Sequence, residues 1–151
     1  MISRNFISVI SKILPTKIAY AHCDVPCGIY DPKPAQIAAQ TVLKMVEKIK
    51  ELDSGLRQND YASMNNFVRM VWTKEEHARK CKEEILILWT DYFKSEHLNM
   101  FPNLHETFWK TAKLCSVNKQ EVSIEHAQEL VKAVDEIAEM FQKAKDNTPK
   151  K

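Results

Sequence analysis

The chain has 151 residues, of which 44% are hydrophobic and 28% are charged, values typical of one globular domain. Its formal net charge of +2 is too small to indicate a nucleic-acid-binding protein. No apolar run approaches the roughly 18 residues that a membrane-spanning helix needs. The whole chain contains only two glycines, which favours helices joined by few turns over a sheet protein.

Residues 1–21 are expected to be a leader that precedes the folded domain at 22–151. They hold three basic residues and no acid, so removing them changes the net charge from +2 to −1. The leader ends in Ala19-Tyr20-Ala21, which is typical of a signal-peptidase site, but Lys12 and Pro15 interrupt its apolar stretch. An organellar transit peptide and a disordered tail fit the composition as well. We favour a cytoplasmic protein, with an organelle as the alternative.

The next eleven residues, His22–Pro32 (HCDVPCGIYDP), form a segment that we call the hook. Its two thiols and one imidazole are ligands that select transition metals over calcium or magnesium. Zinc sites usually combine a Cys-x-x-Cys pair with a second ligand pair, whereas three residues separate Cys23 from Cys27 and no second pair is present. Taken alone, the two cysteines could also form a disulfide or a thiol redox pair. Together with His22, they predict a compact loop around one metal ion.

Three further hook residues are predicted to shape this loop. Pro26 fixes its own φ and can bend the chain so that Cys27 returns to the metal. Gly28 can adopt a positive φ where other residues would clash. Asp24 can accept backbone N–H bonds across the turn.

Four amphipathic helices are predicted after the hook, each from apolar residues spaced three and four apart. The first begins at Pro32 and Pro34 and ends near Ser54-Gly55. Its inward face comprises Ala38, Thr41, Met45, Ile49 and Leu52. The second begins near Asn59-Asp60, and its apolar stripe comprises Tyr61, Met64, Val68, Val71, Ala78, Cys81, Ile85, Leu88 and Tyr92.

The third helix opens at Pro102, with the inward residues Leu104, Phe108, Thr111 and Cys115. Ser123 caps the fourth, whose stripe comprises Ala127, Leu130, Val134, Ile137 and Phe141. Such helices with short links predict an all-α, up-down four-helix bundle behind the N-terminal hook.

Other chemically active residues are assigned to the bundle. Cys81 and Cys115 lie on apolar stripes and are expected to be buried core cysteines, not metal ligands. The Lys74-Glu75-Glu76 run is expected on a solvated face, with Glu75 near the buried stripe. Surface or bundle-edge positions are expected for His97, His105 and His126.

The hook meets every fixed position of the pattern His-Cys-Asp-x-Pro-Cys-Gly-x-Tyr-Asp-Pro, and so resembles the metal hook of nickel superoxide dismutases. The blocks Trp89–Lys94 and Pro102–His105 are also similar to that family, so the resemblance covers roughly residues 22–146. It implies conversion of superoxide to dioxygen and hydrogen peroxide by Ni(II)/Ni(III) cycling, with one nickel ion per chain. It also implies a homohexamer in which each hook lies against a neighbouring subunit.

The resemblance implies that His22, Cys23 and Cys27 are the metal ligands. Cleavage before His22 by a leader-processing protease would free an α-amino group, which can bind the metal together with the backbone nitrogen of Cys23. Two nitrogens and two thiolates form a square plane suited to Ni(II) or Cu(II). We therefore expect the full-length chain to be inactive and removal of residues 1–21 to activate it.

The resemblance also places Tyr30 at the mouth of the site, where its hydroxyl would hold a water or the incoming anion. Tyr92 and Lys94 are expected to line the same approach. The alternatives are that Tyr92 is a core residue and that Lys94 is a solvated lysine at a helix end. In family members an acid and an arginine support the histidine ligand, and the matching residues here are Ala38 and His77. Glu75 or His77, in this or another subunit, could take over this support.

Two other functions fit parts of the pattern. A metal-binding or metal-delivery protein could use the same hook without turnover, although it would not need Tyr30 at the mouth of a rigid site. A thiol-disulfide protein would usually carry Cys-x-x-Cys on a βαβ unit, which is missing here.

Overall fold

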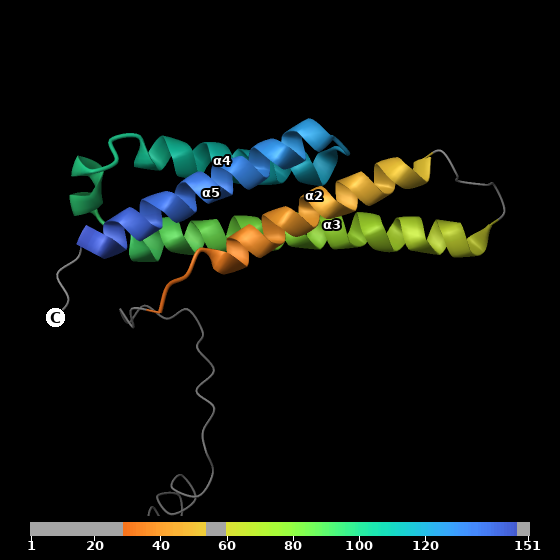
Figure 1. The fold of residues 1–151 in the computed structure, drawn as a ribbon, viewed down its shortest axis with the longest axis horizontal. Coiled ribbons are helices and arrows are strands. Elements are labelled where there is room, and N and C mark those ends of the chain that lie inside the picture. The colour runs from red at the N-terminus through yellow and green to blue at the C-terminus, as the bar shows by residue number, and fades with distance from the viewer. Residues whose placement is uncertain (1–28, 54–59, 148–151) are drawn as a thin grey trace, which may run out of the picture.

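The computed structural model describes residues 29–53 and 60–147. These ranges contain no strand and four α-helices: α2 (Lys33–Asp53), α3 (Tyr61–Ile87), α4 (Leu104–Gln120) and α5 (Ile124–Asn147). The helices run alternately in opposite directions, each packs against the next, and α5 closes the bundle against α2 (Figure 1). The predicted all-α, up-down four-helix bundle is confirmed. The leader and residues 22–28 of the hook lie outside the described residues.

Local side chains explain where three of the helices begin. Pro34 lies in the first turn of α2, where an N–H has no helical partner. Asp60 caps α3 by accepting the N–H of Ala62 at 3.1 Å. The Ser123 hydroxyl accepts the N–H of His126 at 3.2 Å at the start of α5. The predicted starts of these helices are confirmed, whereas α4 begins at Leu104, two residues after Pro102.

The helix faces that form the core agree with the prediction for α4 and α5, whose predicted inward residues are all buried. The predicted face of α2 is partly wrong. Val42 and Val46 are fully buried, whereas Thr41 and Met45 are only half-buried. The two rows are one residue apart and both satisfy helical spacing. The all-apolar row faces the core, while the Thr41 hydroxyl donates to the carbonyl of Ile37 at 2.8 Å.

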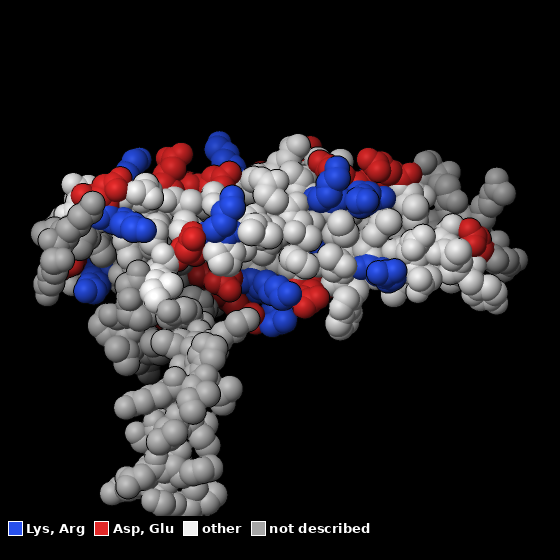
Figure 2. Space-filling view, turned by 60° about the horizontal axis from the view of Figure 1, so that its bottom comes forward, with Lys and Arg blue, Asp and Glu red and all other residues white. Residues whose placement is uncertain are grey.

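The N-terminal half of α3 carries a row of exposed apolar side chains, which we call the α3 stripe: Tyr61 (85% exposed), Met64 (50%), Val68 (62%) and Trp72 (70%). The prediction that Tyr61, Met64 and Val68 face the core of this chain is therefore wrong. This part of α3 extends beyond the ends of α4 and α5, which leave it uncovered (Figure 1). Acidic and basic residues alternate along most of the face in Figure 2, but the end that carries the start of α3 is mostly uncharged.

A buried lysine fastens the middle of α3 to the end of α4. Lys74 is only 2% exposed, so the prediction of a solvated side chain is wrong. Its ammonium donates to the carbonyls of Asn118, Lys119 (2.8 Å) and Glu121 (3.1 Å), and it also pairs with Glu75 at 3.1 Å. Carbonyls at a helix C-terminus have no partner within the helix, and a cation there also interacts favourably with the helix dipole.

Candidate metal centre

The candidate metal ligands His22, Cys23 and Cys27 lie outside the described residues, as do Asp24, Pro26 and Gly28. Their donor set nevertheless fits nickel, because two thiolates and one imidazole are soft and borderline ligands that suit this metal. Within 29–53 and 60–147, no group of three or more His, Cys, Asp and Glu side chains could hold a metal ion. The described part of the chain therefore offers no competing site.

The structure brings Tyr30 and Tyr92 together at one end of the bundle. Their ring centroids are 5.6 Å apart, with an angle of 58° between the planes. The Tyr92 ring also lies 4.3 Å from the ring of Phe141 on α5. Tyr30 thus attaches the C-terminal end of the hook to the end of α3. Tyr92 is half-buried, so it belongs to the edge of the core and also contacts the hook.

A local change in helix geometry positions Tyr92. The end of α3 widens into a π-helical turn, η1 (Leu88–Tyr92), in which the N–H of Phe93 donates to the carbonyl of Leu88 at 3.0 Å. Such turns often occur at functional sites. Phe93 then leaves the helix with an extended backbone, and its buried ring meets that of Tyr92 edge-on at 5.1 Å. Phe93 is therefore buried in the core, whereas Tyr92 is half-buried at its edge.

The surroundings of Tyr92 favour its neutral form. Burial raises the pKa of Tyr92, and the negative charge of Asp146 raises this pKa further. The phenol therefore keeps its proton at neutral pH and can donate a hydrogen bond.

Lys94 is exposed and precedes a short 3₁₀ helix, η2 (Ser95–Asn99). This position, two residues past Tyr92, fits both a steering role and a solvated lysine. His97 in η2 is only 8% exposed, so of the two expected positions the surface is wrong, whereas its place in the corner between α3 and α4 agrees with the edge of the bundle. Its ring stacks on Tyr92 with 5.9 Å between centroids. His105 is exposed, as expected, and its Nδ1 accepts the indole N–H of Trp89 at 2.9 Å.

The candidate supports of the histidine ligand are Ala38 on α2 and Glu75 and His77 on α3. Ala38 is buried in the core and offers no polar side-chain atom. Nδ1 of His77 lies 2.9 Å from the carbonyl of Thr73. Glu75 lies seventeen residues before Tyr92, about 25 Å along the helix.

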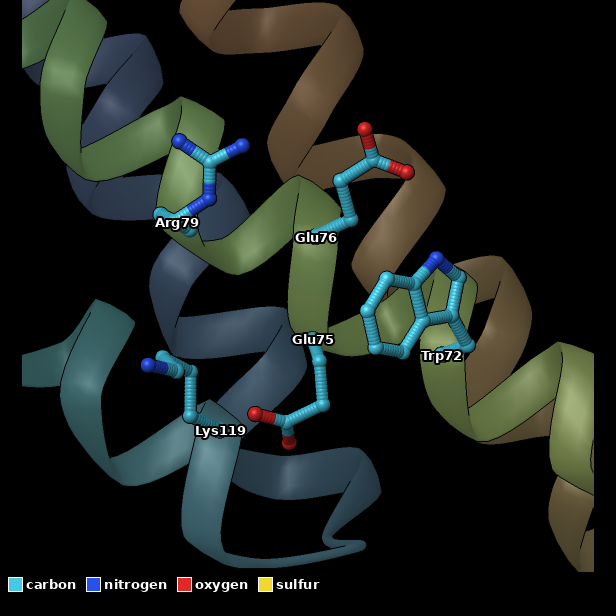
Figure 3. Close-up of a pocket in the computed structure, with 5 residues that line it drawn as sticks. All are labelled: Trp72, Glu75, Glu76, Arg79 and Lys119. Atoms are coloured by element: carbon cyan, nitrogen blue, oxygen red, sulfur yellow. The ribbon is translucent and has the colours of Figure 1, made fainter.

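Glu75 borders an open hollow of about 320 Å³ between α3 and the end of α4, which is lined by Trp72, Glu75, Glu76, Arg79 and Lys119. The Glu75 carboxylate points toward Lys119 of α4, and the indole of Trp72 lies at the opposite side (Figure 3). The hollow continues the α3 stripe and is separate from the Tyr30–Tyr92 contact. Within one chain, it is therefore not part of the mouth of the site.

A helical bundle that carries a thiol and imidazole hook defines a metalloprotein. Residues 17–145 match the sequence profile of a family described as nickel-containing superoxide dismutase. The chain is 31% identical over 138 residues to the superoxide dismutase [Ni] of Streptomyces coelicolor, and 30% identical over 138 residues to that of Streptomyces seoulensis. In both cases the match covers 91% of this chain and 98% of the relative.

Solved structures agree. A native structure of nickel superoxide dismutase superposes with a TM-score of 0.70 at 31% identity, covering 82% of this chain and 99% of the other. An apo structure gives 0.68 at 28% identity, covering 79% and 99%. The chain belongs to the nickel-containing superoxide dismutase family. Superoxide is its substrate and nickel is its cofactor, one ion per chain, so the predicted enzyme class is confirmed.

Proposed function

We propose that cleavage before His22 turns an inactive precursor into a superoxide dismutase consisting of residues 22–151. His22, Cys23 and Cys27 would hold the nickel, with the freed α-amino group and the backbone nitrogen of Cys23 as additional donors. Bound nickel supplies one-electron chemistry by cycling between Ni(II) and Ni(III). The two thiolates donate charge strongly and so bring the oxidised state within reach, which nitrogen and oxygen donors alone would not do. In this proposal, Asp24, Pro26 and Gly28 hold the loop in shape.

The contact between Tyr30 and Tyr92 is the observation that carries this proposal. Tyr30 is three residues past Cys27, so the two residues can be at most about 10 Å apart along an extended chain. Because the Tyr30 ring is held on the bundle, the proposal puts the metal ion and its ligand Cys27 near the same end. The Tyr30 hydroxyl can then hold water or superoxide beside the metal, with Tyr92 behind it. The exposed ammonium of Lys94 would attract the anion.

The experiment compares the trimmed chain, which begins at His22, with a chain that keeps Ala21. N-terminal sequencing and nickel analysis accompany the activity assay. We expect one nickel ion per trimmed chain together with activity. We expect loss of activity when Ala21 is retained, because the α-nitrogen of His22 is then part of a peptide bond and is no longer a free amine. Cys27→Ser in the trimmed chain should abolish nickel binding. Cys81→Ser is the matched control, since Cys81 is fully buried between helices.

Two outcomes contradict the proposal. One is normal activity in the chain that keeps Ala21. The other is normal activity in a variant that lacks both hook thiols.

The α3 stripe supports the further proposal that the chain assembles as a homohexamer, because monomeric proteins rarely leave such apolar rows uncovered. A Met64→Lys/Val68→Asp variant should form smaller species in analytical ultracentrifugation while keeping its helix content. Asn65→Asp, an exposed position between them, is the control and should assemble like the wild type. Unchanged assembly of the double variant would rule out the stripe as an interface.

The compartment and the processing protease belong to the same proposal. None of the described helices combines the length and apolarity needed to cross a membrane. The interrupted apolar stretch of the leader supports cytoplasmic cleavage by a protease that recognises the Ala21–His22 junction. Cell fractionation, combined with the N-terminal sequence of the recovered chain, tests this: mature chain found mainly in an organelle would contradict it.

A further inference from the structure

We propose that His97 is a positioning residue for the mouth of the site. The face of its imidazole holds the Tyr92 ring, and its Nδ1 atom holds the backbone of Lys94. The inference rests on the proposed function, because that function places Tyr92 and Lys94 at the approach to the metal. It concerns different atoms, however, and it can be tested separately.

The first contact of His97 is with the ring of Tyr92. The two rings are nearly parallel, with 5.9 Å between centroids and 9° between planes. The Tyr92 ring also contacts the rings of Tyr30 at 5.6 Å, Phe93 at 5.1 Å and Phe141 at 4.3 Å. His97 adds a fourth aromatic contact. Phe93 in turn meets His97 edge-on at 5.5 Å. A change in the tilt of Tyr92 would therefore disturb its stacking on His97.

The second contact is polar and reciprocal. The backbone N–H of Lys94 donates to Nδ1 of His97 at 2.9 Å, and the backbone N–H of His97 donates to the carbonyl of Lys94 at 3.0 Å. The carbonyl of His97 accepts the N–H of Met100 at 3.1 Å and that of Phe101 at 2.9 Å. One residue therefore holds the chain on both sides of the corner between α3 and α4.

These contacts define the state of the imidazole. Nδ1 can accept the Lys94 N–H only when it carries no proton, so the ring is the neutral tautomer with its proton on Nε2. At 8% exposure, little water can replace the lost acceptor. His97 lies in η2, a 3₁₀ helix of five residues, and the internal hydrogen bonds of 3₁₀ helices have poor geometry. The backbone at Lys94 therefore depends on this side chain.

Two substitutions separate the two contacts. His97→Phe keeps an aromatic ring against Tyr92 but removes the acceptor. His97→Asn keeps a short acceptor for the Lys94 N–H, as capping residues do, but removes the ring. We expect amide hydrogen exchange at Lys94 to accelerate about fivefold or more in His97→Phe and to stay near the wild-type rate in His97→Asn. The ionisation of Tyr92, followed by tyrosinate absorbance, should shift toward its ordinary pH range only in His97→Asn.

Activity provides the readout that a purely structural role would not reproduce. If His97 acts through Tyr92, His97→Asn should lower kcat/KM in the wild type but should lower it no further in a Tyr92→Phe background. His105→Asn is the matched control, because His105 is an exposed histidine that contacts Trp89. It should leave both the Tyr92 titration and the Lys94 exchange rate unchanged. Circular dichroism checks that each variant remains helical.

The wild-type chain also tests the proposal without any substitution. Nitrogen-15 NMR of the imidazole should show an unprotonated Nδ1, and a proton on Nδ1 would overturn the proposal. Additive losses from His97→Asn and Tyr92→Phe would also overturn it. If Tyr92→Phe leaves the rate unchanged while the exchange and titration results follow the expectation, the proposed role of Tyr92 in superoxide access fails and the positioning by His97 stands.

Discussion

Replacing Lys74 by methionine should destabilise the bundle strongly, because it removes a buried cation and keeps the apolar stem. The bond to the Asn118 carbonyl is buried, and a hydrogen bond to a charged group contributes about 1.5–3 kcal/mol. The bonds to the carbonyls of Lys119 and Glu121 are part-buried, so water can replace them, and we assign about 0.5 kcal/mol to each. The partly exposed pair with Glu75 adds little. The free energy of unfolding should fall by about 3 kcal/mol.

Urea unfolding of the nickel-free trimmed chain measures this change. With a slope of about 2 kcal/mol per molar urea, a loss of about 3 kcal/mol lowers the midpoint by roughly 1.5 M. All variants are compared at one chain concentration, because the proposed assembly would add to apparent stability. Lys110→Met is the matched control: Lys110 pairs with Glu106 on an exposed helix face, and its loss should leave the midpoint unchanged.

A midpoint shift below about 0.5 M for Lys74→Met would refute the reasoning. It would mean that the end of α4 satisfies its carbonyls equally well without the lysine. A similar shift for Lys110→Met would show that loss of any lysine, buried or exposed, has the same effect.

Three further predictions concern groups with shifted pKa values. A hydrogen bond with Cys115, together with burial, raises the pKa of the Cys81 thiol, so alkylation of the native nickel-free chain should label the hook thiols and spare Cys81, as mass spectrometry can show. The pKa of Tyr92 is raised, so the stability that neutral Tyr92 contributes is complete below the ordinary tyrosine pKa of about 10 and is lost as pH rises above that value. Tyr92→Phe should therefore flatten the decline of the unfolding free energy at alkaline pH. The hydrogen bonds from Ser63 and Ala62 lower the pKa of Asp60. The Asp60 cap therefore stabilises α3 fully at pH values above the ordinary aspartate pKa, and this stabilisation is lost as pH falls through the pKa of Asp60 in the folded chain. Amide exchange at Ala62, corrected for its intrinsic pH dependence, should then accelerate, and an unchanged rate would contradict the last prediction.

Periodicity predicted α4 and α5 well because each has one unambiguous apolar row. It failed where two readings satisfied the same spacing, as for Met45 and Val46 in α2. It also could not distinguish an apolar row in the core from an apolar row on the surface, which explains the error at the α3 stripe. Lys74 was missed because the backbone carbonyls that accept from it lie at least 44 positions away in the sequence.

In the candidate site too, what is local in sequence could be predicted, and contacts between distant segments could not. The proposed metal ligands are local in sequence, and their assignment comes from one short motif. The contact between Tyr30 and Tyr92 joins distant segments, and the family resemblance alone suggested it. His97 gave no usable signal, since it lies in a five-residue helix without amphipathic periodicity. Its partners became visible only when the corner between α3 and α4 was placed in space.

The three tryptophans occupy positions that make them useful optical reporters. Trp72 is 70% exposed on the α3 stripe, so its emission should respond to the subunit contacts proposed for that stripe. Trp89, whose indole N–H donates to His105, is three residues before Tyr92 and should respond to events at the hook. Replacing Trp109 and one of the other two by phenylalanine would give two single-tryptophan proteins. The protein that keeps Trp72 would then report on assembly, and the protein that keeps Trp89 would report on metal loading.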